Sequence, residues 1–211
     1  MNGRREELGR RFARLVTRIV VARPGLWRVF RRPLRAEFDR LAPNWENVRG
    51  PEAMAPLGEA LDRLDDKPAR ALDLGTGTGK AARFVAERFP HAEIVGVDLS
   101  PGMVEQAREL VPPELASRLR FEVADASALP FADGEFDLVV LLNMIPFFDE
   151  LARVTAAGGT LAFAWYSGPD TPIWTPPETL RARLEPYGFE RFDELEVGMG
   201  TAFLARRAKP G

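Results

Sequence analysis

A glycine-rich loop is the first place in this chain where residue types and spacing could do chemistry. Ala71 and Leu72 lead into the stretch Asp73-Leu-Gly-Thr-Gly-Thr-Gly79. Its glycines let the backbone turn tightly and let a ligand approach the main chain, where a bulky side chain would block it. The stretch therefore predicts a ligand-binding turn between a buried strand and a helix.

The spacing of these glycines matches neither of two common phosphate-binding templates in full. A P-loop needs glycine five positions before its Gly-Lys pair and Ser or Thr after the lysine, but those positions hold Leu74 and Ala81. The dinucleotide fingerprint Gly-x-Gly-x-x-Gly fits Gly75 and Gly77 but requires glycine where Lys80 stands. Since variants of that fingerprint exist, an NAD-dependent Rossmann oxidoreductase stays open as an alternative.

Side chains that suit a nucleoside follow the second apolar run. Asp98 ends that run 23 residues beyond Gly75, where a carboxylate can accept hydrogen bonds from both hydroxyls of a ribose. Leu99 and Met103 follow at the start of the next helical stretch and could lie against a flat adenine ring. For Met103, a core-filling role fits equally well.

Further polar groups follow the third and fourth runs. Asp125 offers an acceptor for an exocyclic amine, and the backbone N–H of Ala126 suits a ring nitrogen. Asn143 could hydrogen-bond a ligand, although a helix cap or a loop-bracing role is an open alternative. The chain has no cysteine and a single histidine, His91, which we place in a surface loop. We therefore expect no metal site and can name no general base.

The elements that must position these residues can be read from hydrophobic periodicity. From residue 69 onward, short β-branched runs alternate with amphipathic stretches, which is typical of a doubly wound α/β fold with a parallel sheet. We expect strands near 69–74, 93–98, 119–124, 136–142, 159–166, 189–197 and 199–206. The predicted helices lie near 78–89, 101–110, 147–156 and 177–186.

The beginning of the chain differs from the rest in charge. Residues 1–40 hold twelve arginines and four carboxylates, although the whole chain of 211 residues has a net charge of -2. Apolar residues at helical spacing predict one basic amphipathic helix, which the pair Pro24-Gly25 interrupts. We divide the chain into a helical basic N-terminal extension, 1–65, and one domain, 66–211. Without a signal peptide or a membrane span, we expect a cytoplasmic protein.

Several of these stretches together resemble the class I S-adenosylmethionine-dependent methyltransferases. The resemblance is strongest to the small-molecule group that includes the ubiquinone and menaquinone biosynthesis enzymes, and it covers roughly residues 69–206. The matching stretches are 72–79, 96–107, 125–129, 136–140 and 150–161. The resemblance implies a Rossmann-like, seven-stranded, mostly parallel sheet in the order 3-2-1-4-5-7-6, with strand 7 antiparallel.

The same resemblance assigns roles to the residues by position. It implies that Asp73 and the loop line the methionine end of S-adenosylmethionine, that Asp98 holds the ribose, and that Asp125 with Ala126 meets the adenine. The complete cofactor-binding set is Asp73, Gly75, Thr76, Gly77, Gly79, Asp98, Leu99, Met103, Asp125, Ala126 and Asn143. Asn143 is also the candidate catalytic residue. We expect methyl transfer to a small apolar or aromatic acceptor; a cofactor-binding module without catalysis is the other alternative.

The basic extension has three interpretations at this point. It could fold over the cleft as a lid, with Trp27, Phe38 and Trp45 lining an apolar acceptor pocket. It could instead lie on a membrane surface and gather an apolar acceptor from anionic lipid. Nucleic-acid binding is the least favoured, because the remainder of the chain is acidic. The sequence does not predict an oligomeric state.

Overall fold

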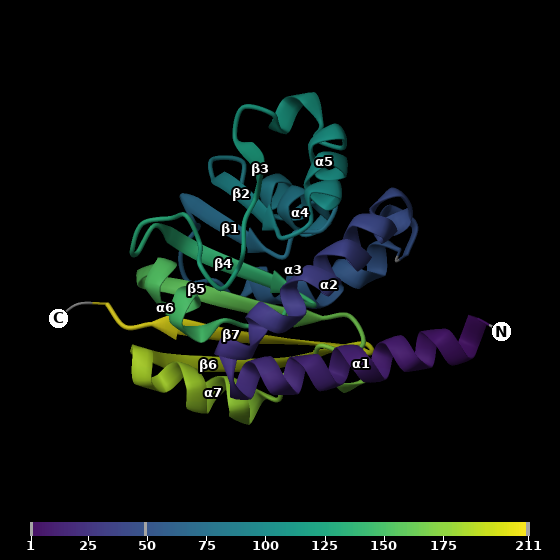
Figure 1. The fold of residues 1–211 in the computed structure, drawn as a ribbon. Coiled ribbons are helices and arrows are strands. Elements are labelled where there is room, and N and C mark those ends of the chain that lie inside the picture. Colours follow the sequence, from purple (N-terminus) through teal and green to yellow (C-terminus); the bar gives the residue numbers. More distant parts are fainter. Residues whose placement is uncertain (1, 49, 210–211) are drawn as a thin grey trace.

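A seven-stranded sheet forms the centre of the computed structural model, which describes residues 2–48 and 50–209 (Figure 1). The strands are β1 Arg70–Leu74, β2 Glu93–Asp98, β3 Leu119–Val123, β4 Phe136–Leu142, β5 Thr155–Trp165, β6 Phe189–Val197 and β7 Gly200–Arg207. Their order is β3-β2-β1-β4-β5-β7-β6. The neighbours from β3 to β5 are parallel, whereas β7 runs antiparallel to both β5 and β6. The predicted order and the antiparallel strand 7 are confirmed.

The register of the central strands brings their polar ends together. Asp73 of β1 lies opposite Gly96 of β2 on one side and Val140 of β4 on the other. Since these strands are parallel, their carboxyl ends emerge at one edge of the sheet. The side chains that follow β1, β2 and β4 are therefore neighbours in space, although 70 positions separate Asp73 from Asn143 in the chain.

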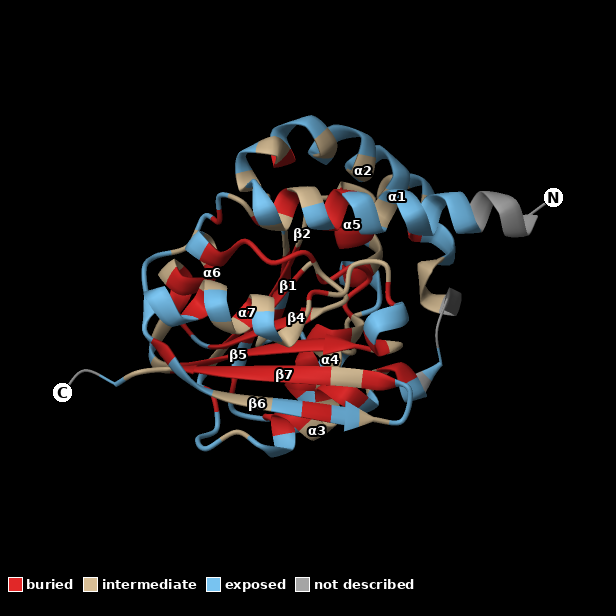
Figure 2. Cartoon of the chain, turned by 90° about the horizontal axis from the view of Figure 1, so that it is seen from below, coloured by how far each residue is buried: buried red, intermediate tan, exposed pale blue. Residues whose placement is uncertain are grey.

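Helices cover both faces of the sheet. They are α1 Asn2–Ala22, α2 Trp27–Leu41, α3 Ala55–Asp62, α4 Lys80–Arg88, α5 Pro101–Glu109, α6 Phe148–Val154 and α7 Pro177–Leu184. Short 3-10 turns are η1 Pro24–Leu26, η2 Ala42–Val48, η3 Pro51–Met54, η4 Pro113–Leu115, η5 Gly168–Asp170 and η6 Glu185–Tyr187. Buried residues of α3, α4 and α5 share one core, and those of α1, α6 and α7 share the other (Figure 2). Alternating residues along each strand supply the two cores.

One boundary between elements differs from the prediction. The helix expected over 147–156 is α6, which ends at Val154, and β5 already begins at Thr155 rather than at residue 159. Thr155 pairs with Phe136, and the register then shifts at an irregularity before the regular ladder starts. Gly158 adopts a φ of 79° in this irregular stretch. A bulged strand start has no clean period-two pattern, so the sequence signal was ambiguous here.

The N-terminal extension packs on the domain. A break at Pro24-Gly25 separates α1 from α2, as predicted, and Pro33 lies inside α2 without ending it. Val16 and Val20 of α1 are buried in the same core as the sheet. Removing the extension would therefore expose part of that core, so single substitutions test its function more sharply than truncation does. None of the described helices combines the length and the apolarity that a membrane span requires.

Candidate functional site

A cavity of about 330 Å³ lies at the carboxyl ends of the central strands. Its size falls in the range of pockets that hold small molecules and cofactors. The predicted cofactor residues that line it are Asp73, Gly75, Thr76, Gly77, Asp98, Leu99, Met103, Ala126 and Asn143. Gly79 and Asp125 are absent from its lining. The structure thus brings together most of the residues that the sequence singled out.

The glycine loop is shaped by backbone conformations that favour glycine. Gly75, Gly77 and Gly79 have φ values of 74°, 54° and 84°, in the left-handed region. The N–H groups of Gly75 and Thr76 both donate to the carbonyl of Val97, which fixes the loop against the end of β2. Gly79 does not line the cavity, but a side chain is excluded at this position because a Cβ would lie 2.6 Å from the ring of Phe121.

Asp98 connects the loop to the next helix. One carboxylate oxygen accepts from the N–H of Gly77 at 2.9 Å, and the other accepts from the N–H of Ser100 at 2.9 Å. Burial raises the pKa of Asp98, while these backbone hydrogen bonds act in the opposite direction. The carboxylate therefore lines the cavity in a fixed orientation.

Asp73 is a buried acid beneath the loop. Its Oδ2 accepts from the hydroxyl of Thr76 at 2.5 Å, and its Oδ1 is buried without a hydrogen-bond partner in the described structure. Burial raises the pKa of Asp73 to about 7, and the charge of Asp98 adds to this shift, whereas the Thr76 hydroxyl, the backbone of Ala82 and the charge of Arg83 oppose it. An orphaned acceptor on the wall of a cavity is a group that a cationic ligand could satisfy.

Asn143 follows β4 in a strained conformation. Its φ is 52°, and no other described residue besides glycine has a positive φ. Its N–H donates to the carbonyl of Ala164, but its side-chain Oδ1 is buried without a partner in the described structure. The side chain therefore caps no helix and braces no loop through that oxygen. A strained backbone that presents an unsatisfied acceptor to a cavity is typical of a functional position.

The carboxylate of Asp125 faces the N-terminal extension. Trp27 Nε1 donates to Asp125 Oδ1 at 2.7 Å, and Arg31 Nη1 lies 3.3 Å from Oδ2. The N–H and the hydroxyl of Ser127 also donate to Oδ1, at 3.0 and 2.7 Å. Asp125 thus holds α2 beside the cavity through these hydrogen bonds, and the next residue, Ala126, lines the cavity. The adenine contact that the sequence assigned to Asp125 stays a prediction.

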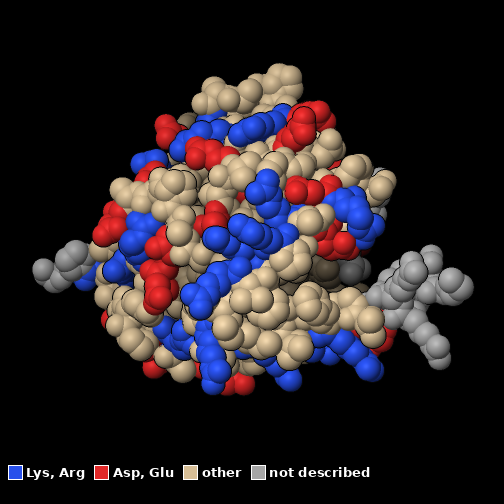
Figure 3. Space-filling model, in the orientation of Figure 1, with Lys and Arg blue, Asp and Glu red and all other residues tan. Residues whose placement is uncertain are grey.

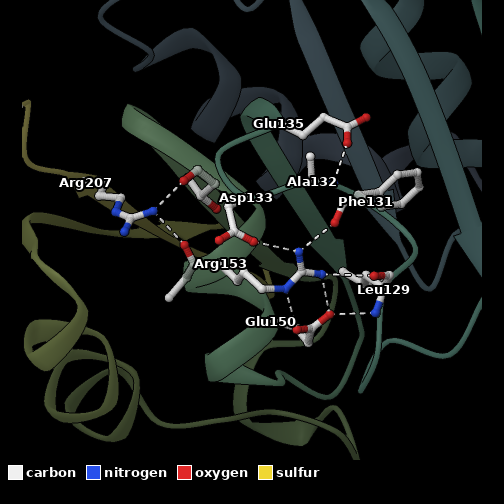
Figure 4. Close-up of polar contacts among 10 residues, drawn as sticks. Leu129, Phe131, Ala132, Asp133, Glu135, Glu150, Arg153 and Arg207 are labelled. Atoms are coloured by element: carbon white, nitrogen blue, oxygen red, sulfur yellow. Dashed lines mark hydrogen bonds and ion pairs between the residues drawn. The ribbon is translucent and has the colours of Figure 1, made fainter.

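A polar cluster around Arg153 braces the loop that follows β3 (Figure 4). Arg153 of α6 donates to the carbonyls of Leu129 and Phe131 at 2.9 and 2.6 Å. It also pairs with Glu150, which accepts from the N–H of Leu129 at 2.6 Å. The stretch 150–161, which the sequence matched to the family, therefore contributes loop support rather than a ligand contact.

The extension covers the glycine loop through Trp45, an expected lid residue, and through Glu46, which sequence reasoning missed. Glu46 of η2 accepts from the Thr78 hydroxyl at 2.6 Å and from Arg83 at 3.0 Å. Trp45 lies so close to the loop that a Cβ on Gly77 would be 3.1 Å from its Nε1. Burial alone would raise the pKa of Glu46, but the hydrogen bonds from Thr78 and Arg83 outweigh it and hold this pKa below its ordinary value.

A second missed residue, Asp39 of α2, fixes the extension to α5. Its Oδ1 accepts from the hydroxyl of Ser100 at 2.5 Å and from the N–H of Gly102 at 3.1 Å. Ser100 is itself the N-cap of α5 and accepts from the N–H of Met103. A carboxylate at a helix start is stabilised by the unpaired N–H groups there. The sequence signal was weak, because Asp39 and Glu37 are simply two acids in a basic segment.

Comparison with known proteins decides between the nucleotide-binding folds. Residues 71–159 match the methyltransferase domain family. Residues 71–159 therefore lie in a methyltransferase domain. This match includes the glycine loop, Asp98, Asp125 and Asn143.

Individual relatives agree with this family. A malonyl-[acyl-carrier protein] O-methyltransferase of Halorhodospira halophila is 37% identical over 150 residues, which are 67% of this chain and 50% of that protein. A demethylmenaquinone methyltransferase of Thermus thermophilus is 42% identical over 113 residues, 50% of this chain and 51% of that protein. The chain spans about half the length of these relatives.

A solved structure supports the fold. The S-adenosylmethionine-dependent methyltransferase of Aquifex aeolicus superposes with a TM-score of 0.63 at 18% identity, over 82% of this chain and 97% of that one. At this identity the likeness shows the fold alone, which is the Rossmann-like methyltransferase fold with the predicted strand order.

The cavity of the methyltransferase domain fits S-adenosylmethionine. The cofactor combines a ribose, an adenine and a cationic amino-acid chain, which need acceptors, a flat apolar wall and negative charge. Asp98 supplies acceptors, and Leu99 with Met103 supplies apolar wall. The buried, unpartnered oxygens of Asp73 and Asn143 suit donors on the amino-acid chain.

The raised pKa of Asp73 predicts a pH-dependent affinity for the cofactor. Since burial raises this pKa to about 7, the carboxyl group is mostly neutral at about pH 6 and mostly ionised at about pH 8. An ionised Asp73 attracts the cationic cofactor, so affinity should rise up to about tenfold per pH unit below pH 7 and level off above it. Calorimetry across this range would measure the slope.

The matching variant is Asp73→Asn, which removes the titrating group and keeps the size of the side chain. It should bind the cofactor more weakly at about pH 8, and its affinity should change less with pH; an undiminished slope would assign the titration to another group.

The stability of the cofactor-free protein should depend on pH in the opposite direction, falling as pH rises. The folded state binds a proton at Asp73 that the unfolded chain has lost, so stability should fall as pH rises from 3.8 to about 7.

Proposed function

We propose that this chain transfers a methyl group from S-adenosylmethionine to a small, apolar or aromatic acceptor. One observation carries the proposal: the cofactor residues and the apolar side chains of the extension line the same cavity. The lid residues expected from the sequence, Trp27, Phe38 and Trp45, are all among them. A cavity covered in this way can hold both reactants and reduce their contact with water.

The residues at the strand ends would hold the cofactor by its polar groups. In this proposal Asp98 accepts from the ribose hydroxyls while its backbone partners, the N–H groups of Gly77 and Ser100, keep the carboxylate aimed. Asp73 and Asn143 receive the amino-acid chain, and Ala126 offers its N–H to the adenine. Asp125 acts by holding Trp27 and Arg31, which positions the extension beside the ring.

Placement supplies much of the rate in this chemistry. The sulfonium of bound S-adenosylmethionine already activates the methyl group, so an acceptor held in line reacts without a covalent intermediate. The protein must therefore orient the acceptor, and the apolar side chains Leu34, Phe38 and Ile173 give the cavity walls for an apolar molecule. The relative named as a malonyl-[acyl-carrier protein] O-methyltransferase supports an oxygen acceptor, and the one named as a demethylmenaquinone methyltransferase supports a quinone-like acceptor.

Product formation tests the proposed activity directly. The protein should convert S-adenosylmethionine to S-adenosylhomocysteine with at least one member of a panel of quinols, phenols and acyl carboxylates, followed by mass spectrometry. Binding of the cofactor without product across a broad panel would favour a binding module. If calorimetry found tight binding of NAD and no binding of S-adenosylmethionine, the oxidoreductase alternative would be favoured.

We also propose that the basic extension brings the enzyme to a membrane surface, where apolar acceptors dissolve.

Asn143 offers the sharpest single-residue test of the site. Asn143→Gly removes the side chain while tolerating the φ of 52°, so the backbone strain does not confuse the result. Loss of one hydrogen bond to a charged group should lower methyl transfer about 10- to 100-fold. The melting temperature should stay the same or rise.

Asn143→Asp is the matched variant, because it keeps an acceptor oxygen at the same place. It should retain more activity than Asn143→Gly, and the two kcat/KM values can be compared with the same acceptor. Equal activity in Asn143→Gly and the unaltered protein would show that the orphaned oxygen plays no part in binding or catalysis.

A further inference from the structure

Helix α1 has one apolar face that the fold leaves uncovered. Val16 and Val20 are 1% and 0% exposed and point into the domain core. Leu8 and Leu15 lie on a different side of the same helix and are 71% and 55% exposed. Burial of a large aliphatic side chain is favourable by about 1.5–3 kcal/mol, so two of them on one exposed face indicate a partner.

The uncovered face continues from α1 onto α2. Phe12 is 48% exposed and contacts the ring of Phe30 of α2 edge to face, with centroids 6.5 Å apart. Val29, next to Phe30, is 60% exposed. We call Leu8, Phe12, Leu15 and Val29 the apolar stripe. Among the residues of known exposure, the other large exposed hydrophobic side chains are Leu110, Val123, Tyr187 and Met199, and they lie outside the extension.

Uncompensated positive charge lies beside the apolar stripe. In the part of the chain that the structure describes, Arg18, Arg28 and Arg32 have no carboxylate partner. Arg10 and Arg14 donate to the carbonyl of Asp170, which does not neutralise them. Figure 3 shows basic side chains forming a band across the face where α1 and α2 lie, beside uncharged surface.

We infer that the apolar stripe and its flanking arginines bind the surface of an anionic lipid bilayer. An exposed apolar face inserts shallowly among lipid chains, while arginines on its flank meet the negative headgroups. A second copy of this chain is a poorer occupant, because it would bring the same positive charges together. RNA would use the arginines but would leave four aliphatic and aromatic side chains without a role.

This contact deepens the proposed function and, for the route of the acceptor, rests on it. Ala13 and Val16 of α1 line the cavity, while Leu8, Phe12 and Leu15 of the apolar stripe are exposed on a neighbouring side of the same helix. One helix therefore separates the proposed membrane contact from the acceptor pocket. An apolar acceptor dissolved in the bilayer would have a short path to the cavity.

Vesicle flotation of the full chain tests the contact without any need for activity. The probes are vesicles of phosphatidylcholine alone and vesicles that contain about one third phosphatidylglycerol. We expect binding to the anionic vesicles, weakening with salt. Leu8→Ser combined with Leu15→Ser should weaken it about tenfold or more, and Arg18→Gln combined with Arg32→Gln about 25-fold, at about fivefold for each arginine.

Matched controls lie away from the extension. Met199→Ser removes a side chain that is 86% exposed, and Arg63→Gln removes a positive charge at the C-cap of α3, a helix that packs on the other face of the sheet. Both should bind anionic vesicles like the unaltered protein. All variants change exposed side chains, and unchanged melting temperatures would confirm that they fold.

Three results would overturn the inference. The first is equal vesicle binding by the stripe variants and the controls, and the second is vesicle binding that does not require anionic lipid. The third is an absence of vesicle binding together with dimerisation or RNA binding that the stripe variants abolish. Failure of the methyl-transfer assay is a separate result. Vesicle binding that depends on the stripe would support the membrane contact even if no acceptor is methylated. Methyl transfer in solution without vesicle binding would support the proposed activity and contradict the membrane contact.

Discussion

Replacing Asp98 with asparagine is expected to weaken S-adenosylmethionine binding about 100-fold or more. The carboxylate accepts from the N–H groups of Gly77 and Ser100 and, in our proposal, from the ribose hydroxyls as well. An asparagine side chain has one acceptor oxygen and one donor group. Whichever way it turns, its NH₂ group faces an N–H that needs an acceptor. The variant therefore loses ribose contacts and loosens the glycine loop at once. Calorimetry with the cofactor measures the loss.

Glu122→Gln is the matched control for Asp98→Asn. It removes one carboxylate from the neighbouring strand β3, where Glu122 pairs with Arg120 at 2.9 Å and does not line the cavity. Its cofactor affinity should stay within about twofold of the unaltered protein, because an exposed ion pair contributes little. If Asp98→Asn bound the cofactor as well as Glu122→Gln does, the assignment of Asp98 to the ribose would be wrong.

The sheet and the core of the site were predictable because their signals are local. Alternation of apolar runs with amphipathic stretches predicts parallel strands, and parallel strands bring their carboxyl ends to one edge. Asp73, Asp98 and Asn143 each follow such a run, so their positions in the sequence already implied proximity. The structure places all three around one cavity.

The contacts of the extension were not predictable in the same way. Periodicity along α1 and α2 showed that they have a buried face, but it carries no information on which distant residues that face meets. The carboxylate of Asp125 meets Trp27, 98 positions away in the chain, and Glu46 meets Arg83 across 37 positions. Such pairs depend on how the helices lie on the sheet. Asp125 could therefore be assigned to a ligand from its local motif alone, without any sign of its partner.

Glu46→Ala is expected to speed the release of the cofactor about 30-fold. In the structure Glu46 holds η2 on the glycine loop through the Thr78 hydroxyl and Arg83, and its backbone carbonyl accepts from Lys80. Hydrogen bonds to charged groups contribute about 1.5–3 kcal/mol each, but partial exposure of Glu46 reduces this to about 2 kcal/mol in total. Stopped-flow measurement of S-adenosylmethionine dissociation would detect the change.

Glu37→Ala tests whether any lost carboxylate in the extension has the same effect. Among the described residues, Glu37 of α2 pairs only with Arg40 of the same helix, so its removal changes the net charge equally but leaves the cover of the loop in place. Its cofactor release should match that of the unaltered protein. A faster release in both variants would mean that the charge of the extension retains the cofactor. A faster release in Glu46→Ala alone would mean that the cover over the loop retains the cofactor, because only that variant removes the side-chain hydrogen bonds from η2 to Thr78 and Arg83.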